Sequence, residues 1–263
     1  MIRFLLILIF ILSSCEDSNE SVNQLRGEAF GTYFYIKSTD DKNLKDIKSS
    51  VENLVDSVNQ SMSTYKQNSI ISNLNRKKSH DVDEMFMTVF DKSKTIYEDT
   101  DGYFDPTIGV LVNYYGFGSK KKQSSDVSLD SLRKFVGFNM LTKEGNTIIK
   151  SNPQIQLDFN SIAKGFAVDK FADLLKHNGY EDFLVDIGGE VYANGEKDKN
   201  QYWTIGVDKP DKKSKNRELS TKIRLKNRAM ATSGNYRKYK INEETGKETV
   251  HTMNPLTGKA EPS

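Results

Sequence analysis

The sequence predicts an α+β fold, built as one intertwined domain with N-terminal helices followed by a mostly antiparallel sheet. Two observations support this prediction. Apolar residues recur at helical spacing through residues 43–60 and 82–98, whereas short β-branched and aromatic runs bounded by turn residues dominate after residue 180. The chain has 263 residues, of which 36% are hydrophobic and 10% aromatic, so it can bury a sizeable core.

Turn and capping residues set the boundaries of these elements. Asp101-Gly102 is expected to end the second helix, and Pro106 lies where the first turn of a third helix would begin. Residues 116–128 are rich in glycine, serine and lysine and are expected to form an exposed loop. The expected helices are residues 43–60, 82–98, 107–115 and 130–136, and a fifth that begins at Asn160 or Ser161 and closes at Gly179. The expected strands are residues 30–36, 147–150, 155–157, 183–187, 190–193, 203–207, 223–225 and 228–232.

The charge balance gives no electrostatic case for nucleic acid as a partner. Lysine and arginine number 38 against 36 aspartates and glutamates, so the formal net charge is only +2. Domains that bind nucleic acid usually have a basic excess gathered on one face. The lysine runs at 120–122 and 212–213 lie among polar residues, and we interpret them as solvated loops rather than a binding patch.

The N-terminus has the features of an exported lipoprotein. Residues 4–12 are an unbroken apolar run after Arg3, too short to cross a bilayer as a folded helix and typical of a signal-peptide core. The run ends in Leu12-Ser13-Ser14-Cys15, which resembles the lipobox of bacterial lipoproteins, where the cysteine is lipidated and becomes the mature N-terminus. Cys15 is the only cysteine, so it cannot form an internal disulfide. The alternative is an ordinary secretory signal with an incidental cysteine.

The predicted organisation is a signal peptide at 1–14, a lipidated polar tether at 15–26 and a folded domain at 27–263. Such a protein would be attached to a bacterial membrane through the lipid on Cys15. Its folded domain would lie on the extracytoplasmic, or periplasmic, side.

Six segments of the folded part combine residue types that are common in binding sites. No GxxxxGK[ST] loop and no GxGxxG after a strand is present, so neither a P-loop nor a dinucleotide-binding Rossmann site is indicated. The segments are 30–32 (FGT), 62–65 (MSTY), 101–107 (DGYFDPT), 157–169 (LDFNSIAKGFAVD), 185–190 (VDIGGE), and 231–236 (ATSGNY) followed by 251–258 (HTMNPLTG).

Lys164 lies in the first turn of the fifth expected helix, where free backbone N–H groups and the helix dipole attract anions. An ammonium at this place suits a diphosphate, but a surface lysine on an amphipathic helix explains it equally well. Gly165 permits close approach to the backbone. Asp158 would accept hydrogen bonds from a ribose or a base, or would cap the helix, and the sequence alone favours capping.

The aromatic and histidine candidates have similar alternatives. Tyr65, Tyr103 and Phe104 offer flat faces to a flavin or an adenine, although most aromatic residues at such positions belong to the core. His251 is one of three histidines and lies near an Asn254-Pro255 turn; a lone histidine is more often structural than catalytic.

In this order, the six segments resemble the ApbE family of FAD:protein FMN transferases, from about residue 27 to the end of the chain. The resemblance implies an ApbE-like fold and the transfer of FMN from FAD to a threonine or serine hydroxyl of an acceptor protein. The product would be a phosphoester, AMP would leave, and Mg²⁺ would be the cofactor. The acceptor suggested by the family is a subunit of a membrane redox complex.

The resemblance also assigns site residues. Family positions that line the FAD site correspond here to Phe30 (commonly Met), Tyr65, Tyr103, Phe104, Asp105, Asp158, Lys164 and His251. The position of Ser161 supplies a backbone oxygen to the magnesium ion, which prefers hard oxygen ligands shared with substrate phosphates. Lys164 and the metal would stabilise charge on the diphosphate, and we hypothesise that His251 takes the proton of the attacking hydroxyl.

Chains of the family continue past the last motif, and a later segment there carries an acidic residue and a threonine that complete the metal site. We therefore expect residues 1–263 to bind FAD weakly and to show little Mg²⁺-dependent transfer. Two other functions stay open: hydrolysis of FAD to FMN and AMP at the same site, and flavin binding by a lipoprotein without catalysis. The order of the motifs disfavours a generic solute-binding lipoprotein.

Overall fold

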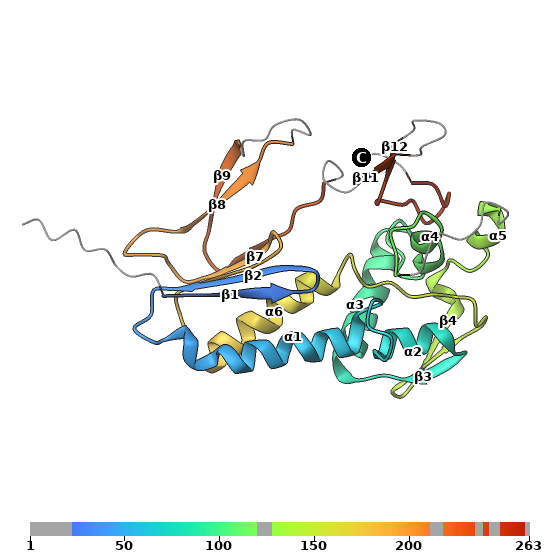
Figure 1. The fold of residues 1–263 in the computed structure, drawn as a ribbon, viewed down its shortest axis with the longest axis horizontal. Helices are drawn as coiled ribbons and strands as arrows, with labels where there is room; N and C mark the ends of the chain where they lie inside the picture. Colours follow the sequence, from blue (N-terminus) through green and yellow to red (C-terminus); the bar gives the residue numbers. More distant parts are fainter. Residues whose placement is uncertain (1–22, 120–127, 211–217, 235–238, 242–247, 261–263) are drawn as a thin grey trace, which may run out of the picture.

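The centre of the fold is a five-stranded antiparallel sheet in the order β1-β2-β6-β7-β10. The computed structural model describes residues 23–119, 128–210, 218–234, 239–241 and 248–260. The five strands are β1 (Asn23–Ala29), β2 (Thr32–Ser38), β6 (Phe183–Ile187), β7 (Glu190–Asn194) and β10 (Arg228–Met230). Since the first hairpin pairs with strands from the last third of the chain, the two halves form one intertwined domain (Figure 1).

A two-residue turn joins β1 to β2. Phe30 (φ 54°) and Gly31 (φ 73°) both have left-handed backbone, as in the type I′ turn whose twist matches that of the flanking strands. The strand expected at 30–36 therefore begins only at Thr32 and runs to Ser38. The sequence did not predict β1, and its residues 23–26 belong to the segment expected as a tether.

Two helices cover one face of this sheet (Figure 1). α6 (Ala163–His177) packs on β6 and β7, and α1 (Lys48–Met62), which follows the short 3₁₀ helix η1 (Leu44–Ile47), packs on α6. Alternate strand residues point toward the helices, so Phe34 is buried against Phe171 with ring centroids 5.6 Å apart. This apolar layer is the main core.

A second group of elements lies beside one end of α1 and α6 (Figure 1). Its centre is α3, whose Phe86 packs edge-to-face on Phe159 at 5.0 Å between centroids. The elements are α2 (Ile70–Arg76), β3 (Ser79–Asp81), α3 (Glu84–Asp99), α4 (Gly109–Tyr114), α5 (Leu129–Arg133), η2 (Phe138–Met140), β4 (Leu141–Glu144) and β5 (Thr147–Lys150). β5 pairs with β3 on one side and with β4 on the other.

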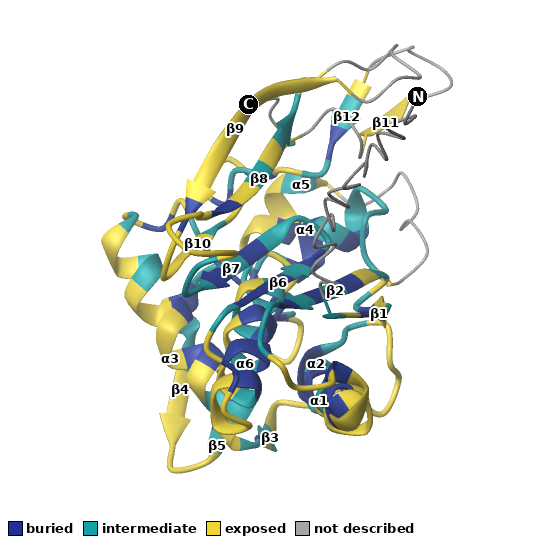
Figure 2. Ribbon diagram, turned by 90° about the vertical axis from the view of Figure 1, so that its left-hand side faces the viewer, coloured by how far each residue is buried: buried dark blue, intermediate teal, exposed yellow. Residues whose placement is uncertain are grey.

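Two hairpins stand away from the central sheet. They are β8 (Trp203–Asp208) with β9 (Leu219–Leu225), and β11 (Tyr239–Ile241) with β12 (Glu248–Val250). Trp203 and Leu225 anchor the first hairpin in a small apolar cluster with residues of β6 and β7. Beyond that anchor β9 is exposed along its length (Figure 2).

The α+β fold with a mostly antiparallel sheet is confirmed, and several predicted boundaries are corrected. Residues 155–157 do not form a strand, because Gln156 makes a single isolated bridge to Ile108 and the backbone of Leu157 bonds to a side chain instead. The last helix begins at Ala163, and neither Asn160 nor Ser161 caps it. The backbone N–H and the side-chain amide of Asn160 donate to the Asp158 carboxylate, so this residue belongs to the loop before the helix.

Within the described ranges, none of the helices combines the length and the apolar content of a membrane span. The expected signal peptide (1–14) and Cys15 lie outside the described residues.

Candidate active site

The N-terminus of α6 carries the most prominent charged pair of the predicted site. Lys164 is the second residue of the helix, and its Nζ lies 2.6 Å from Oε2 of Glu190, the first residue of β7. Gly188 (φ 57°) and Gly189 (φ 99°) form the turn that places Glu190 at the strand start. Both side chains are partly buried, and Glu190 is the less exposed of the two.

Open space adjoins this pair. A Cβ atom added to Gly165 would meet nothing within 4 Å, although the residue lies in the first turn of a helix whose other face is in the core. The N–H of Ala163 already donates to the carbonyl of Phe159 at 2.8 Å, so an anion here would be attracted by the next N–H groups of the first turn and by the helix dipole. The geometry therefore supports the anion-binding interpretation of Lys164.

Asp158 shapes the loop before α6 and joins two of the sequence motifs. Its carboxylate accepts hydrogen bonds from the backbone N–H and the side-chain amide of Asn160, at 2.8 and 3.0 Å. The N–H of Asp158 donates to the carbonyl of Pro106 at 2.7 Å, so segments 101–107 and 157–169 lie side by side. Burial raises the pKa of the Asp158 carboxyl, against the opposing effect of its hydrogen bonds.

Asp105 is a buried clamp within the chain. One carboxylate oxygen accepts from the N–H and hydroxyl of Thr107, at 2.8 and 2.6 Å, and the other accepts from the N–H of Phe138 at 3.1 Å. Burial raises the pKa of this carboxyl, although the three hydrogen bonds act in the opposite direction. The arrangement shows that Asp105 holds the turn after Tyr103 and Phe104, and its contact with FAD stays a prediction.

Two polar residues that the sequence did not single out hold the segment before Asp158. Asn75 of α2 donates to the carbonyl of Leu157 at 2.8 Å and accepts from its N–H at 2.7 Å. Lys150 is fully buried and donates to three backbone carbonyls, those of Asn75, Pro153 and Ile155, at 3.3, 3.0 and 2.8 Å. The sequence shows only a lysine at the end of the predicted 147–150 strand, and its burial is visible only in the structure.

Tyr65, Phe117 and His251 meet on another side of the site. The hydroxyl of Tyr65 donates to the carbonyl of Phe117 at 3.2 Å, and the Phe117 and His251 rings lie 6.3 Å apart, edge to face. Burial and, to a lesser extent, the negative charge of Asp158 raise the pKa of the Tyr65 hydroxyl, so that carboxylate lies nearby. The sequence did not single out Phe117, which links two predicted residues 186 positions apart.

Two of the predicted aromatic residues are exposed and do not belong to the core. Tyr65 and Tyr103 are 62% and 65% exposed, so neither is a core residue, and both offer ring faces to a ligand. Phe104 is half-buried, and its N–H donates to the hydroxyl of Thr100. Phe30 lies in the β1–β2 turn and packs against the main core.

The HTMNPLTG segment packs on the second group of elements. Oδ1 of Asn254 accepts from the N–H groups of Leu256 and Thr257, and the hydroxyl of Tyr115 donates to the carbonyl of Gly258 at 3.2 Å. A Cβ added to Gly102 would lie 3.5 Å from a methyl group of Leu256. The last motif is thereby placed beside the turn that carries Tyr103.

Comparison with known proteins identifies the family to which these motifs belong. The family model described as "ApbE family" matches residues 30–262. The chain belongs to the ApbE family. The family resemblance found in the motifs is thus confirmed, and all eight predicted FAD-site residues fall within the matched region.

Individual relatives agree with this ApbE assignment. A protein of Vibrio cholerae named FAD:protein FMN transferase is 34% identical over 260 residues, covering 95% of this chain and 76% of the relative. A protein of Haemophilus influenzae with the same name is 33% identical, covering 94% and 75%. The solved structure of the flavin transferase ApbE from Vibrio cholerae superimposes with a TM-score of 0.78 at 31% identity, covering 90% of this chain and 78% of that one. The ApbE protein of Thermotoga maritima gives a TM-score of 0.79 at 26% identity.

The described residues of this ApbE chain do not by themselves fit a complete magnesium shell. Across the described part of the chain, no three histidine, cysteine, aspartate or glutamate side chains gather into a potential metal site. The carboxylates of Asp105 and Asp158 are held by their own turns. Mg²⁺ requires near-octahedral oxygen coordination, and the backbone oxygen of Ser161 alone supplies only one candidate ligand.

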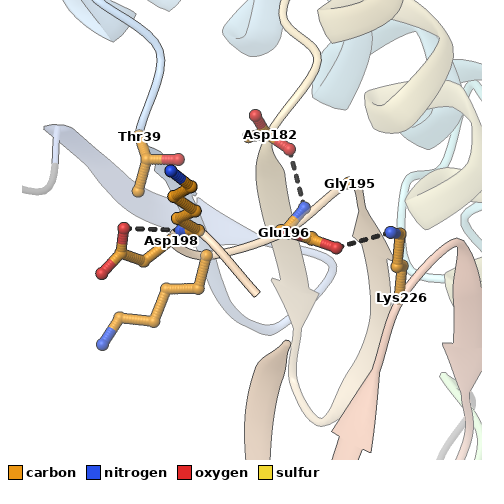
Figure 3. Close-up of a pocket in the computed structure, with 8 residues that line it drawn as sticks. Thr39, Asp182, Gly195, Glu196, Asp198 and Lys226 are labelled. Carbon is orange, nitrogen blue, oxygen red and sulfur yellow. Dashed lines mark hydrogen bonds and ion pairs between the residues drawn. The ribbon is translucent and has the colours of Figure 1, made fainter. Parts of the chain in front are cut away.

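An open cavity of about 420 Å³ lies away from these residues, beyond the other end of β7. Its lining includes Thr39, Asp182, Gly195, Glu196, Asp198 and Lys226 (Figure 3). None of the predicted site residues lines it, so it is not the predicted FAD site.

Proposed function

We propose that this chain is an enzyme that transfers FMN from FAD to a threonine or serine hydroxyl of an acceptor protein. The relatives that share three quarters of their length with it are named FAD:protein FMN transferases. The observation that most supports the proposal is Lys164 in the first turn of α6 beside the open space at Gly165. A helix N-terminus with a cation suits a dinucleotide diphosphate.

The remaining residues suit the rest of FAD. The exposed rings of Tyr65 and Tyr103 provide stacking faces for the isoalloxazine or the adenine. Asp158 has a buried carboxylate that is held by Asn160 and lies near Tyr65, and we propose that it contacts FAD from the loop before α6. Asp105 acts indirectly, by fixing the turn that carries Tyr103 and Phe104.

In the proposed reaction the acceptor hydroxyl oxygen attacks the phosphorus of the FMN half. A new phosphorus–oxygen bond to the acceptor forms as the bond between that phosphorus and the bridging oxygen breaks, and AMP leaves with the bond electrons. We assign the hydroxyl proton to His251, whose ring lies beside that of Phe117, the residue whose carbonyl accepts from Tyr65. The Lys164 ammonium would stabilise the negative charge that develops on the diphosphate.

We propose Mg²⁺ as the cofactor, because the ApbE family resemblance implies it and assigns the backbone oxygen of Ser161 to it. A bound Mg²⁺ would supply charge neutralisation at the phosphates, with the Ser161 backbone oxygen and the diphosphate among its ligands. Because the described residues provide an incomplete shell, no step above depends on the metal.

The test is to incubate the full chain with FAD, Mg²⁺ and an acceptor protein carrying a target threonine, and to measure flavin fluorescence on the denatured acceptor. We expect fluorescence that stays on the acceptor, with AMP in equal amount, but at a low level for residues 1–263, because the described residues provide an incomplete metal shell. Free FMN without labelled acceptor would favour the pyrophosphatase alternative. Tight FAD binding without turnover would favour a non-catalytic flavin-binding lipoprotein.

We also propose that the chain is lipid-anchored through Cys15 on the extracytoplasmic side of a bacterial membrane. The support is the apolar run at 4–12 that ends in LSSC. An acceptor within a membrane redox complex would then lie in the same compartment as the enzyme.

A further inference from the structure

Glu190 forms an ion pair with a residue of the proposed FAD site. Its Oε2 accepts from Lys164 Nζ at 2.6 Å, across the junction of α6 and β7. Glu190 is 18% exposed and Lys164 is 32% exposed, so the carboxylate is the more desolvated partner. The pair joins the VDIGGE motif to the LDFNSIAKG motif, which are 26 positions apart at these residues.

We propose that Glu190 competes with the diphosphate of the substrate for the Lys164 ammonium, and so sets the anion affinity of the site. This inference rests on the proposed function, because it assumes that Lys164 meets a diphosphate. The ion pair would open when the ligand binds and would re-form when the nucleotide product leaves.

The two partners differ in their freedom to move. Glu190 follows the left-handed glycines 188 and 189 and pairs in the sheet with Ile187, so its backbone is held in place. Lys164 has a long flexible side chain, and the space beside it at Gly165 is open. Lys164 is therefore the partner that turns toward the ligand, while Glu190 stays at the strand start.

The energetic consequence follows from desolvation. When Lys164 turns away, Glu190 is left as a partly buried carboxylate without its cation, a state that costs free energy. This cost weakens the binding free energy of any ligand that draws Lys164 away from Glu190. A ligand without phosphate does not recruit the ammonium and avoids the cost.

The chain contains a matched control pair. Lys226 Nζ lies 2.6 Å from Oε1 of Glu196, with side chains 41% and 29% exposed, in the separate cavity beyond β7 (Figure 3). Glu196→Gln therefore removes a carboxylate from a similar lysine contact outside the proposed site.

The experiment measures the dissociation constants of FAD, inorganic pyrophosphate and riboflavin by calorimetry for the wild-type chain, Glu190→Gln and Glu196→Gln. Because removal of the Glu190 carboxylate frees Lys164 from its ion pair, we expect the dissociation constants of FAD and pyrophosphate to be about three- to tenfold lower in Glu190→Gln. Riboflavin affinity should be unchanged, and Glu196→Gln should match the wild type for all three ligands. In a Lys164→Met background, Glu190→Gln should no longer tighten FAD or pyrophosphate.

Unchanged or weaker pyrophosphate and FAD binding in Glu190→Gln would overturn the inference, as would an equal gain for riboflavin. Failure of the wild-type chain to bind either phosphate ligand would also overturn it. If Glu190→Gln does not fold, the comparison of Lys164→Met with the wild type decides. Loss of the Glu190 contact offsets part of what Lys164 contributes to FAD binding, so Lys164→Met should weaken FAD binding less than threefold. A larger loss would contradict the competition. Absence of covalent transfer with intact FAD binding would remove the proposed function and leave this inference standing.

Discussion

Replacement of Asn75 by alanine should destabilise the protein through a buried backbone rather than through lost packing. The Asn75 side chain donates to the carbonyl of Leu157 at 2.8 Å and accepts from its N–H at 2.7 Å. Leu157 is fully buried, so alanine would leave one N–H and one C=O group without these partners. Each unsatisfied buried group costs about 1–3 kcal/mol, and we expect the free energy of unfolding to fall by about 2–4 kcal/mol.

The assay is thermal unfolding followed by circular dichroism, supported by urea titration. For a chain of this size each kcal/mol shifts the melting temperature by about 2–4 °C, so we expect a fall of roughly 5–15 °C. Asn73→Ala is the matched control, since Asn73 lies on the same helix and its side chain contacts only exposed groups, Arg76 and the carbonyl of Asn68. That control should change stability by about 0.5 kcal/mol or less.

The same variant tests the link between this buried contact and the site. Leu157 directly precedes Asp158, so folded Asn75→Ala should also bind FAD more weakly than Asn73→Ala does. Equal melting temperatures for the two variants would refute the reasoning, because the Leu157 backbone would then have found other partners at no cost.

Three further predictions concern charge, pH and location. Lys164→Ala should weaken FAD binding more than riboflavin binding, because riboflavin has no phosphate for the ammonium to hold; equal losses measured by fluorescence quenching would assign the residue to packing. Burial raises the pKa of Asp105 in the folded state, so the wild type's stability relative to Asp105→Asn should fall as pH rises from about 4 through that raised pKa and stay level above it. Urea titrations across this pH range measure the difference in unfolding free energy between the wild type and Asp105→Asn. A difference that increases with pH would contradict the prediction. Cys15→Ser should release the protein from membranes, whereas unchanged fractionation without lipid label would remove the lipoprotein proposal.

Elements with strong local signals could be predicted from the sequence alone. The run at 183–187 is apolar, short and bounded by turn residues, and β6 occupies those residues as predicted. The helix expected at 82–98 has an apolar stripe and the N-cap Asp83, whose side chain accepts from the N–H of Phe86 at 2.7 Å. Both signals arise from residues within a few positions of one another, so no tertiary information was needed.

Elements whose stability depends on distant partners escaped prediction. β1 (NQLRGEA) has a mixed polar sequence and is a strand because it pairs along its whole length with β2. Residues 155–157 have strand-like composition, but their backbone bonds go to Asn75 and across to the 105–109 turn. In both cases the hydrogen-bond partners, rather than local propensity, decide the conformation.

The sequence by itself identified the candidate site residues, because each motif is recognisable within a short stretch of the chain. They include Lys164, Asp158, Tyr65 and His251. Only the tertiary structure decided what those side chains touch. Glu190 meets Lys164 from the start of another strand, and Phe117 meets both Tyr65 and His251. Asp105 holds its own turn, because Thr107 and Phe138 donate hydrogen bonds to its carboxylate. Such contacts depend on where the chain returns in space, which the spacing of residues along it does not specify.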